Sequence, residues 1–226
     1  MGPILPALRR AFYRVSLGDH SYRFLFGPEP KGEAVSLDCE TTGLDRQRDD
    51  IVSIAAVRLV GNRILLSERF QATIQPEAAL SPASIRIHGL RARDLEGGEP
   101  IRQVLPRLLR FIGSRPLVGY YLDFDVAMLD RHVLPMIQAK LPNRRIEISA
   151  LYYRFKYGHA PPGTVVDLRF PALLEELGIP LRRQHDALGD AVAAAEAYLQ
   201  LVDMAQRRVR PHRKRAAIDS APPTGA

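Results

Sequence analysis

The chain has 226 residues, which is long enough for one sizeable α/β domain with its own core. Hydrophobic residues make up 46% and charged residues 25%, and no apolar stretch approaches the ~18 residues of a membrane span. The single cysteine, Cys39, excludes an internal disulfide, and the first residues lack the order of a signal peptide. We therefore expect a cytoplasmic protein with no membrane association.

The net charge of +7 is concentrated at one end of the chain. Residues 207–226 hold six Lys/Arg and one Asp, which leaves 26 basic and 24 acidic residues in 1–206. We expect 207–226 to be a basic, disordered tail, either a solvated end or a source of phosphate contacts.

The first segment, residues 1–31, is predicted to precede the domain. Its apolar residues Ile4, Leu8, Phe12 and Val15 fall at helical spacing and predict a short amphipathic helix. Such a helix packs on the body of the protein or on a protein partner. We expect the domain itself to span residues 32–206.

Three segments that follow, 33–39, 51–60 and 63–74, are predicted strands, with a turn at Gly61-Asn62. Alternation along the first strand separates its side chains into two sets. Val35, Leu37 and Cys39 lie on one face, and Ser36, Asp38 and Glu40 lie on the other.

The rest of the domain alternates helices with short strands. Helices are predicted to begin at Ser81, to span 101–112, and to run from near Asp125 until Pro135 bends or ends them. Strands are predicted at 117–119 and 146–148, a loop at 158–163, and helices at 173–177 and 187–204. This order predicts an α/β fold with a mixed central sheet of about five strands flanked by helices.

Four acidic residues stand out within these elements. Asp38 and Glu40 share one strand face, Asp125 lies near a helix start, and Asp190 lies in the first turn of the last helix. If the fold brings them together, mutual repulsion raises their pKa values. A pair of divalent cations roughly 3.5–4 Å apart would relieve the repulsion and serve phosphodiester cleavage.

The order Asp-x-Glu, a distant Asp, and then His185-x-x-x-x-Asp190 resembles the DEDDh-type 3′→5′ exonucleases. This superfamily includes the proofreading (epsilon) subunit of bacterial DNA polymerase III, and the resemblance covers about residues 33–206. It implies a ribonuclease-H-like fold. It also implies metal-dependent hydrolysis of terminal phosphodiesters of DNA or RNA, which releases nucleoside 5′-monophosphates from a single-stranded 3′ end.

The resemblance also assigns roles to the acidic residues. Asp38, Glu40, Asp125 and Asp190 would hold two ions, Mg²⁺ or Mn²⁺, with Asp38 bridging both. Glu40 and Asp190 would complete the ion on the side of the attacking water, and Asp125 would hold the ion near the leaving group. His185 would act as the general base, for which a pKa near neutrality is suitable.

Substrate contacts are implied for Thr41, Gly43, Leu44, His88 and Phe124. Leu44 would pack against the terminal base, while His88 makes either a substrate contact or a structural turn. Where the family has Gly-His-Asn-x-x-Phe-Asp, this chain has Gly119-Tyr-Tyr-Leu-Asp-Phe-Asp125. The substituted Tyr120 and Tyr121 would stack on bases or serve as packing. Asp123 is a rival ligand to Asp125, or a helix cap.

A second interpretation is a catalytically weak module that binds nucleic acid or associates with a polymerase. Metal-dependent release of mononucleotides would separate it from the exonuclease. The preference for DNA or RNA, the substrate length and the oligomeric state stay open at this point.

The basic tail generates a first prediction. Truncation after Gln206 removes a net charge of +5, so nucleic-acid affinity should fall and its salt dependence should flatten by ~0.7 in log–log slope for each lost phosphate contact. Turnover of saturating short substrate should be nearly unchanged, because no proposed catalytic group lies beyond Asp190. Binding measured across a salt series checks this, and an unchanged slope would identify the tail as a solvated end.

Overall fold

The computed structural model describes residues 13–15, 17–158, 164, 166–180 and 186–208. Most of the predicted N-terminal helix, the tail beyond 208 and the loop at 159–163 lie outside the described residues, although Tyr13–Val15 are helical. No helix within the described ranges has the length and apolar character needed to cross a bilayer.

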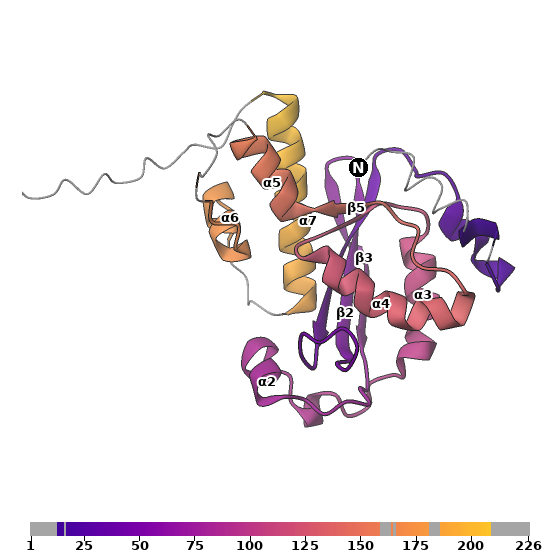
Figure 1. The fold of residues 1–226 in the computed structure, drawn as a ribbon. Helices are drawn as coiled ribbons and strands as arrows, with labels where there is room; N and C mark the ends of the chain where they lie inside the picture. The colour runs from indigo at the N-terminus through magenta and orange to yellow at the C-terminus, as the bar shows by residue number, and fades with distance from the viewer. Residues whose placement is uncertain (1–12, 16, 159–163, 165, 181–185, 209–226) are drawn as a thin grey trace, which may run out of the picture.

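The centre of the fold is a five-stranded mixed sheet (Figure 1). Its strands are β1 (Glu33–Thr41), β2 (Ile51–Val60), β3 (Arg63–Thr73), β4 (Leu117–Gly119) and β5 (Arg145–Glu147). In space the order is β3-β2-β1-β4-β5, in which the first three strands are antiparallel neighbours and β4 runs parallel to both β1 and β5. The predicted meander and mixed sheet are confirmed.

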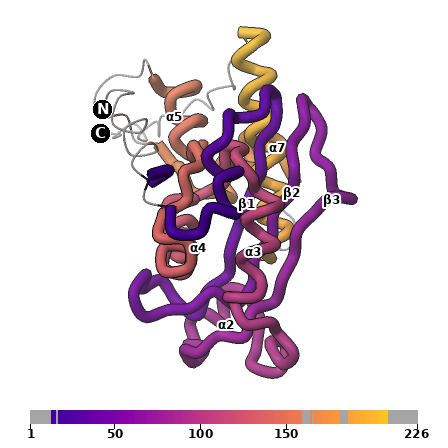
Figure 2. The backbone as a smooth tube through the Cα atoms, turned by 90° about the vertical axis from the view of Figure 1, so that its right-hand side faces the viewer, coloured from indigo at the N-terminus to yellow at the C-terminus, as the bar shows by residue number. Residues whose placement is uncertain are grey.

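Helices cover both faces of the sheet (Figures 1 and 2). One hydrophobic core lies against α3 (Ile101–Ile112), α4 (Leu122–Ile137) and the 3₁₀ helix η1 (His20–Phe26). The other core lies against α5 (Ile148–Tyr157), α6 (Phe170–Leu177) and α7 (Ala187–Gln206). The short helices α2 (Pro82–His88) and η2 (Ala92–Asp94) lie on the connection between β3 and α3.

The central strand β1 shows the predicted alternation. Val35, Leu37 and Cys39 are buried in the core on the α3 and α4 side. On the opposite face the fully buried Ser36 hydroxyl donates a hydrogen bond of 2.7 Å to the backbone carbonyl of Ala191 in α7. This bond fixes the beginning of α7 over the strand face that carries Asp38 and Glu40.

One local prediction differs from the structure and another is refined. Helix α4 ends at Ile137, two residues after Pro135, because a proline in the last turn removes only one backbone donor, and the Gln138 N–H closes the end on the Leu134 carbonyl. Residue Ile148 begins α5 and does not extend β5, because the Glu147 carboxylate accepts the Ser149 N–H and caps a helix there.

Candidate active site

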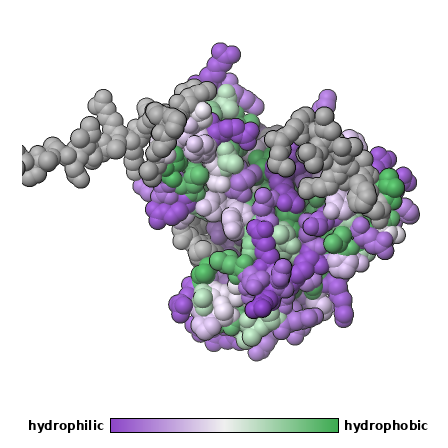
Figure 3. Space-filling view, in the orientation of Figure 1, coloured by the Kyte–Doolittle hydropathy of each residue, from purple (hydrophilic) through white to green (hydrophobic). Residues whose placement is uncertain are grey.

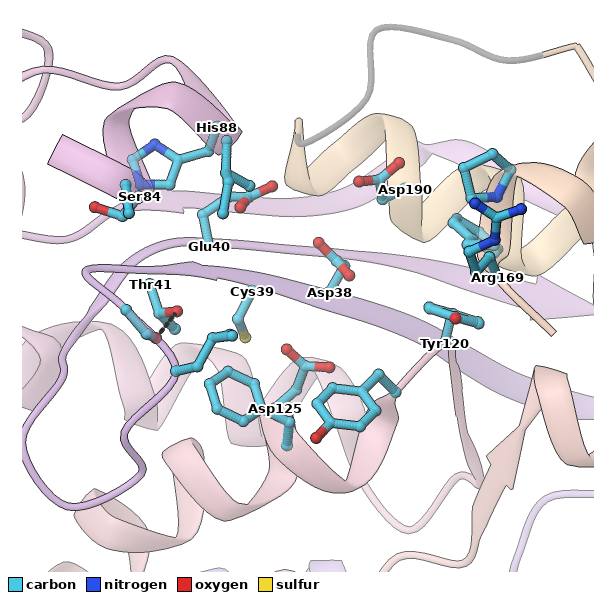
Figure 4. Close-up of a pocket in the computed structure, with 18 of the residues that line it drawn as sticks. Asp38, Cys39, Glu40, Thr41, Ser84, His88, Tyr120, Asp125, Arg169 and Asp190 are labelled. Atoms are coloured by element: carbon cyan, nitrogen blue, oxygen red, sulfur yellow. Dashed lines mark hydrogen bonds between the residues drawn. The ribbon is translucent and has the colours of Figure 1, made fainter. Parts of the chain in front are cut away.

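Three of the predicted carboxylates meet where β1 ends beneath α7 (Figure 4). Asp38 and Glu40 project from β1, and Asp190 projects from the first turn of α7. One carboxylate oxygen from each residue lies within 4.8 Å of those from the other two. A separation this small lets a single cation contact all three.

The beginning of α7 is ordered by its own cap. The Asp186 carboxylate accepts a 3.1 Å hydrogen bond from the Gly189 N–H, and the Asp186 carbonyl accepts the Asp190 N–H at 2.9 Å. The positive end of the helix dipole favours a carboxylate at Asp190. Together with the Ser36 bond, this cap gives Asp190 a defined position opposite β1.

Asp125 approaches the same groove from the other side of β1 (Figure 4). It lies in the first turn of α4 and is 4% exposed. The start of α4 is held by Glu147, whose carboxylate accepts the Tyr121 N–H at 3.1 Å and the Leu122 N–H at 2.9 Å. The sheet neighbour β5 therefore positions the helix that presents Asp125.

The rival residue Asp123 lies elsewhere. Its carboxylate pairs with Arg145 at 2.6 Å, and its side chain is 75% exposed. It is not the cap of α4 either, because the capping position is Tyr121 and the capping carboxylate belongs to Glu147. Of the two aspartates, Asp125 is the one that lines the groove.

Burial and crowding set the electrostatics of the carboxylates. Burial, followed by the charges of Asp125, Glu40 and Asp190, raises the pKa of Asp38 well above its usual value. Burial raises the pKa of Asp125 in the same direction, against hydrogen bonds from backbone N–H groups. The pKa of Glu40 rises to about 7 through burial and the charges of Asp190 and Asp186.

This donor set fits divalent cations. All the groups are hard oxygen donors, the combination that Mg²⁺ and Mn²⁺ prefer. No cationic side chain is ion-paired with Asp38, Glu40 or Asp125 within the described part of the chain. Cations from solution would therefore supply the missing positive charge.

The loop after β1 holds Leu44 over the groove. The Thr41 hydroxyl donates a 2.6 Å hydrogen bond to the Gly43 carbonyl. A side chain at Gly43 would overlap the Asp49 carboxylate, which accepts hydrogen bonds from the Thr42 hydroxyl and the Asp45 N–H. The tight loop leaves Leu44 74% exposed, and it lines the same groove as the carboxylates.

His88 and Phe124 also line the groove, although each is only 6% exposed. The Nδ1 atom of His88 accepts the Leu90 N–H at 3.0 Å, so the imidazole stabilises the turn that ends α2. Both of the interpretations proposed for His88 are thus compatible with its location.

Tyr120 and Tyr121 differ from each other. The Tyr120 hydroxyl donates to the Leu168 carbonyl at 3.1 Å, and its ring stacks on Phe170 with centroids 4.7 Å apart. Tyr120 therefore packs the groove wall between β4 and α6. Tyr121 is 60% exposed within the groove.

Several groove residues were missed by the sequence analysis. The groove has a volume of about 730 Å³, and its walls include Ile87 of α2, Arg169 next to α6, and Phe170 and Leu174 of α6. No local pattern marks these residues, because only the packing of α2 and α6 around β1 makes them neighbours. The predicted base His185 lies outside the described residues.

Comparison of the sequence with known protein families identifies the family of this chain. The family model described as Exonuclease (RNase T) matches residues 35–198. The chain belongs to this exonuclease family. The matched range contains every proposed carboxylate ligand and His185, and the resemblance to the DEDDh-type exonucleases is confirmed.

The curated relatives carry names of DNA polymerase III or of proteins like its epsilon subunit. The chain is 33% identical, over 80% of its length, to the "DNA polymerase III subunit epsilon-like protein" of Rhodobacter capsulatus, and it spans 25% of that protein. It is 30% identical to the PolC-type DNA polymerase III of Thermotoga maritima, over 76% of this chain and 12% of the polymerase. The Aquifex aeolicus DNA polymerase III subunit epsilon is 24% identical over 76% of this chain and 81% of the subunit.

Solved structures share the fold at lower identity. Exonuclease X, solved with 5′-overhanging duplex DNA, has a TM-score of 0.60 and 21% identity, over 76% of this chain and 93% of that one. Escherichia coli exonuclease I, solved with a dA16 oligonucleotide, has a TM-score of 0.65 and 18% identity, over 79% of this chain and 42% of that one. The ribonuclease-H-like fold expected from the sequence is thereby confirmed.

The raised pKa of Glu40 generates a prediction for the metal-free protein. Its pKa is about 7 in the folded state, whereas a glutamate side chain in an unfolded chain has a pKa of about 4.5, so between these pH values the folded state binds more protons than the unfolded state. Stability should therefore fall as pH rises from about 4.5 to 7, by an amount on the order of 3 kcal/mol.

Urea denaturation in a chelator across this pH range measures the effect. Glu40→Gln should reduce the loss, because the amide does not titrate, whereas Glu96→Gln, at an exposed position outside the groove, should leave it unchanged. Stability that rises over this window in the wild-type protein would contradict the account.

Proposed function

We propose that the chain is a metal-dependent 3′→5′ exonuclease that hydrolyses the terminal phosphodiester of a nucleic acid. The observation that supports this most strongly is the convergence of Asp38, Glu40 and Asp190 within 4.8 Å in a groove that Asp125 also lines. The groove has a volume of about 730 Å³, and the family is one of exonucleases that depend on divalent metal ions.

The carboxylates would hold two divalent ions, with Mg²⁺ or Mn²⁺ as the proposed species. Asp38 lies between Asp125 and Asp190 and is suited to contact both ions (Figure 4). Glu40 and Asp190 would complete one site and Asp125 the other. When bound, such ions polarise the phosphoryl group, lower the pKa of water and orient an in-line attack.

The side chains of the protein would also align the substrate and transfer the proton. A water oxygen forms a bond to the terminal phosphorus while the bond to the 3′ oxygen of the preceding nucleotide breaks. His185, five residues before Asp190, would accept the proton from the water. The departing 3′ oxygen takes up a proton from solvent. The products are a nucleoside 5′-monophosphate and a strand that is shorter by one nucleotide and ends in a 3′ hydroxyl.

The substrate class is supported by the relatives. Exonuclease I has been solved with dT13 and dA16 oligonucleotides, and exonuclease X with 5′-overhanging duplex DNA. Leu44, held over the groove by the Gly43 loop, would contact the terminal base. A nucleic-acid 3′ end is accordingly our proposed ligand, and a protein partner through the N-terminal segment is a separate proposal.

Time courses with purified protein and 5′-labelled oligonucleotides would test the reaction. Single-stranded DNA, duplex DNA and RNA would each be incubated with Mg²⁺, with Mn²⁺ or with a chelator. We expect a ladder of products that shorten from the 3′ end, together with nucleoside 5′-monophosphates, only when a metal is present. Binding without release of mononucleotides would instead favour the catalytically weak binding module.

Substitution of the ligands is a direct prediction. Asp38→Ala and Asp190→Ala should each abolish hydrolysis, while the metal-free protein should lose little stability because one like charge leaves a crowded cluster. Asp123→Ala is the matched control, because this exposed aspartate precedes Asp125 by two residues and pairs with Arg145. Near-wild-type hydrolysis by both Asp38→Ala and Asp190→Ala at matched metal concentration would show that the active site lies elsewhere.

Removal of the proposed base, His185, should affect turnover but not metal binding, unlike removal of a ligand. His185→Ala should lower turnover by ~10²–10⁴-fold, the usual range for general-base assistance, and should leave metal affinity nearly unchanged. Single-turnover rates and calorimetric metal titrations separate the two effects. If metal affinity falls together with turnover, His185 is a ligand or a structural residue.

A further inference from the structure

Exposed apolar side chains surround the carboxylates. Leu44 is 74% exposed, Ile87 is 49% exposed and Tyr121 is 60% exposed, and all three line the same groove. They come from three separate elements: the loop after β1, helix α2 and the start of α4. Hydrophobic residues are visible on the lobe that contains α2 in Figure 3. An exposed apolar rim around a groove of polar groups is typical of a ligand site.

Tyr121 is held in a backbone conformation that disfavours it. Its φ of 57° and ψ of 28° are left-handed, a conformation that is unfavourable for L-residues other than Gly, Asn or Asp. The conformation is imposed by the start of α4, where Glu147 accepts the N–H groups of Tyr121 and Leu122. Because Tyr121 remains 60% exposed, burial in the core does not explain a tyrosine at this position.

The ring of Tyr121 forms the outer layer of an aromatic stack. Its centroid lies 5.8 Å from that of Phe124, with an interplanar angle of 20°. Phe124 is 6% exposed and also has the Arg46 guanidinium 5.7 Å from its ring centroid. The aromatic surface that the pair offers to a ligand therefore belongs to Tyr121 rather than to Phe124.

The neighbouring Tyr120 does not share this property. Its hydroxyl is hydrogen-bonded to Leu168 and its ring is stacked on Phe170, so its interactions are satisfied within the protein. The two adjacent tyrosines thus divide into a packing residue and an exposed ring.

We propose that Tyr121 stacks on an unpaired base of the substrate strand, close to its 3′ end. This inference rests on the proposed exonuclease function, because the adjacent carboxylates place a phosphodiester in the same groove. Stacking on an aromatic side chain contributes ~1–3 kcal/mol per base and tolerates any sequence, since every base has a π face. A base inside a duplex is already stacked on its neighbours, so the site selects single-stranded or frayed ends.

Binding measurements on three variants test the proposal. The ligand is a fluorescent single-stranded oligonucleotide with phosphorothioate linkages at its 3′ end, titrated by anisotropy in Mg²⁺. Tyr121→Asn should weaken binding by ~5- to 150-fold, the equivalent of losing one stacked base, without lowering the thermal midpoint, because asparagine tolerates the left-handed backbone. Tyr121→Phe, which keeps the ring, should bind within about twofold of the wild type.

The chain offers a matched control in Tyr153. It is 44% exposed, stacks on Tyr157 with centroids 6.1 Å apart, and lies on α5 outside the groove. Tyr153→Asn should leave oligonucleotide affinity unchanged. Tight binding by Tyr121→Asn would overturn the proposal, and so would a loss of affinity in that variant that accompanies a lower thermal midpoint.

Hydrolysis by the wild-type protein is measured in parallel and keeps the two proposals separate. Hydrolysis with unaltered binding by Tyr121→Asn would retain the exonuclease and reject the stacking role. If the wild-type protein hydrolyses no substrate but Tyr121→Asn still weakens binding, the exonuclease is rejected. Tyr121 would then stack on a base of a strand that is bound and not cleaved.

Discussion

The structure depends on one unfavourable arrangement, the convergence of several carboxylates in a partly buried groove. Burial and mutual repulsion raise the pKa values of Asp38, Glu40 and Asp125, so the metal-free protein has a free-energy cost whenever these groups ionise. The surrounding elements hold the groups together despite this cost. Bound divalent cations would offset this cost, because the clustered negative charges would then act as their ligands.

Three hydrogen bonds fix the relative positions of Asp38, Glu40, Asp125 and Asp190, and none of them is made by the side chains of these four residues. Ser36 ties β1 to α7, Asp186 caps α7 in front of Asp190, and Glu147 caps α4 in front of Asp125. Because β1 is the middle strand of the sheet, with antiparallel and parallel neighbours, it offers little freedom to Asp38 and Glu40. The site is thus built from a rigid strand and two capped helix ends.

The sequence was sufficient for the parts of the fold that local patterns determine. The alternation along residues 33–39 predicted which face carries Asp38 and Glu40, and the strand at 51–60 has the predicted bounds. The helix containing Pro135 ends two residues later than the proline, at Ile137, and α5 was not predicted at all. The bond from the Leu122 N–H to Glu147 could not be predicted, because it joins residues 25 positions apart.

The sequence predicted which acidic residues converge in the candidate site, but it did not predict the groove around them. The spacing of the acidic residues and their resemblance to the exonucleases identified which carboxylates to compare. Ile87, Phe170 and Leu174 have no signature of their own, because their relation to β1 arises only from the packing of α2 and α6. For Tyr120 and Tyr121 the sequence left stacking and packing open, and the difference in their exposure comes from the fold.

In the metal-free protein the carboxylate cluster is a cation site whose groups are partly protonated. Calorimetric titration with Mn²⁺ at pH 6.5, in two buffers of different ionisation enthalpy, tests this. We predict saturable binding of two ions per chain and release of protons, since a group such as Glu40, with a pKa of about 7, must ionise to bind metal. The absence of saturable binding, or binding at pH 6.5 without proton release, would contradict the account.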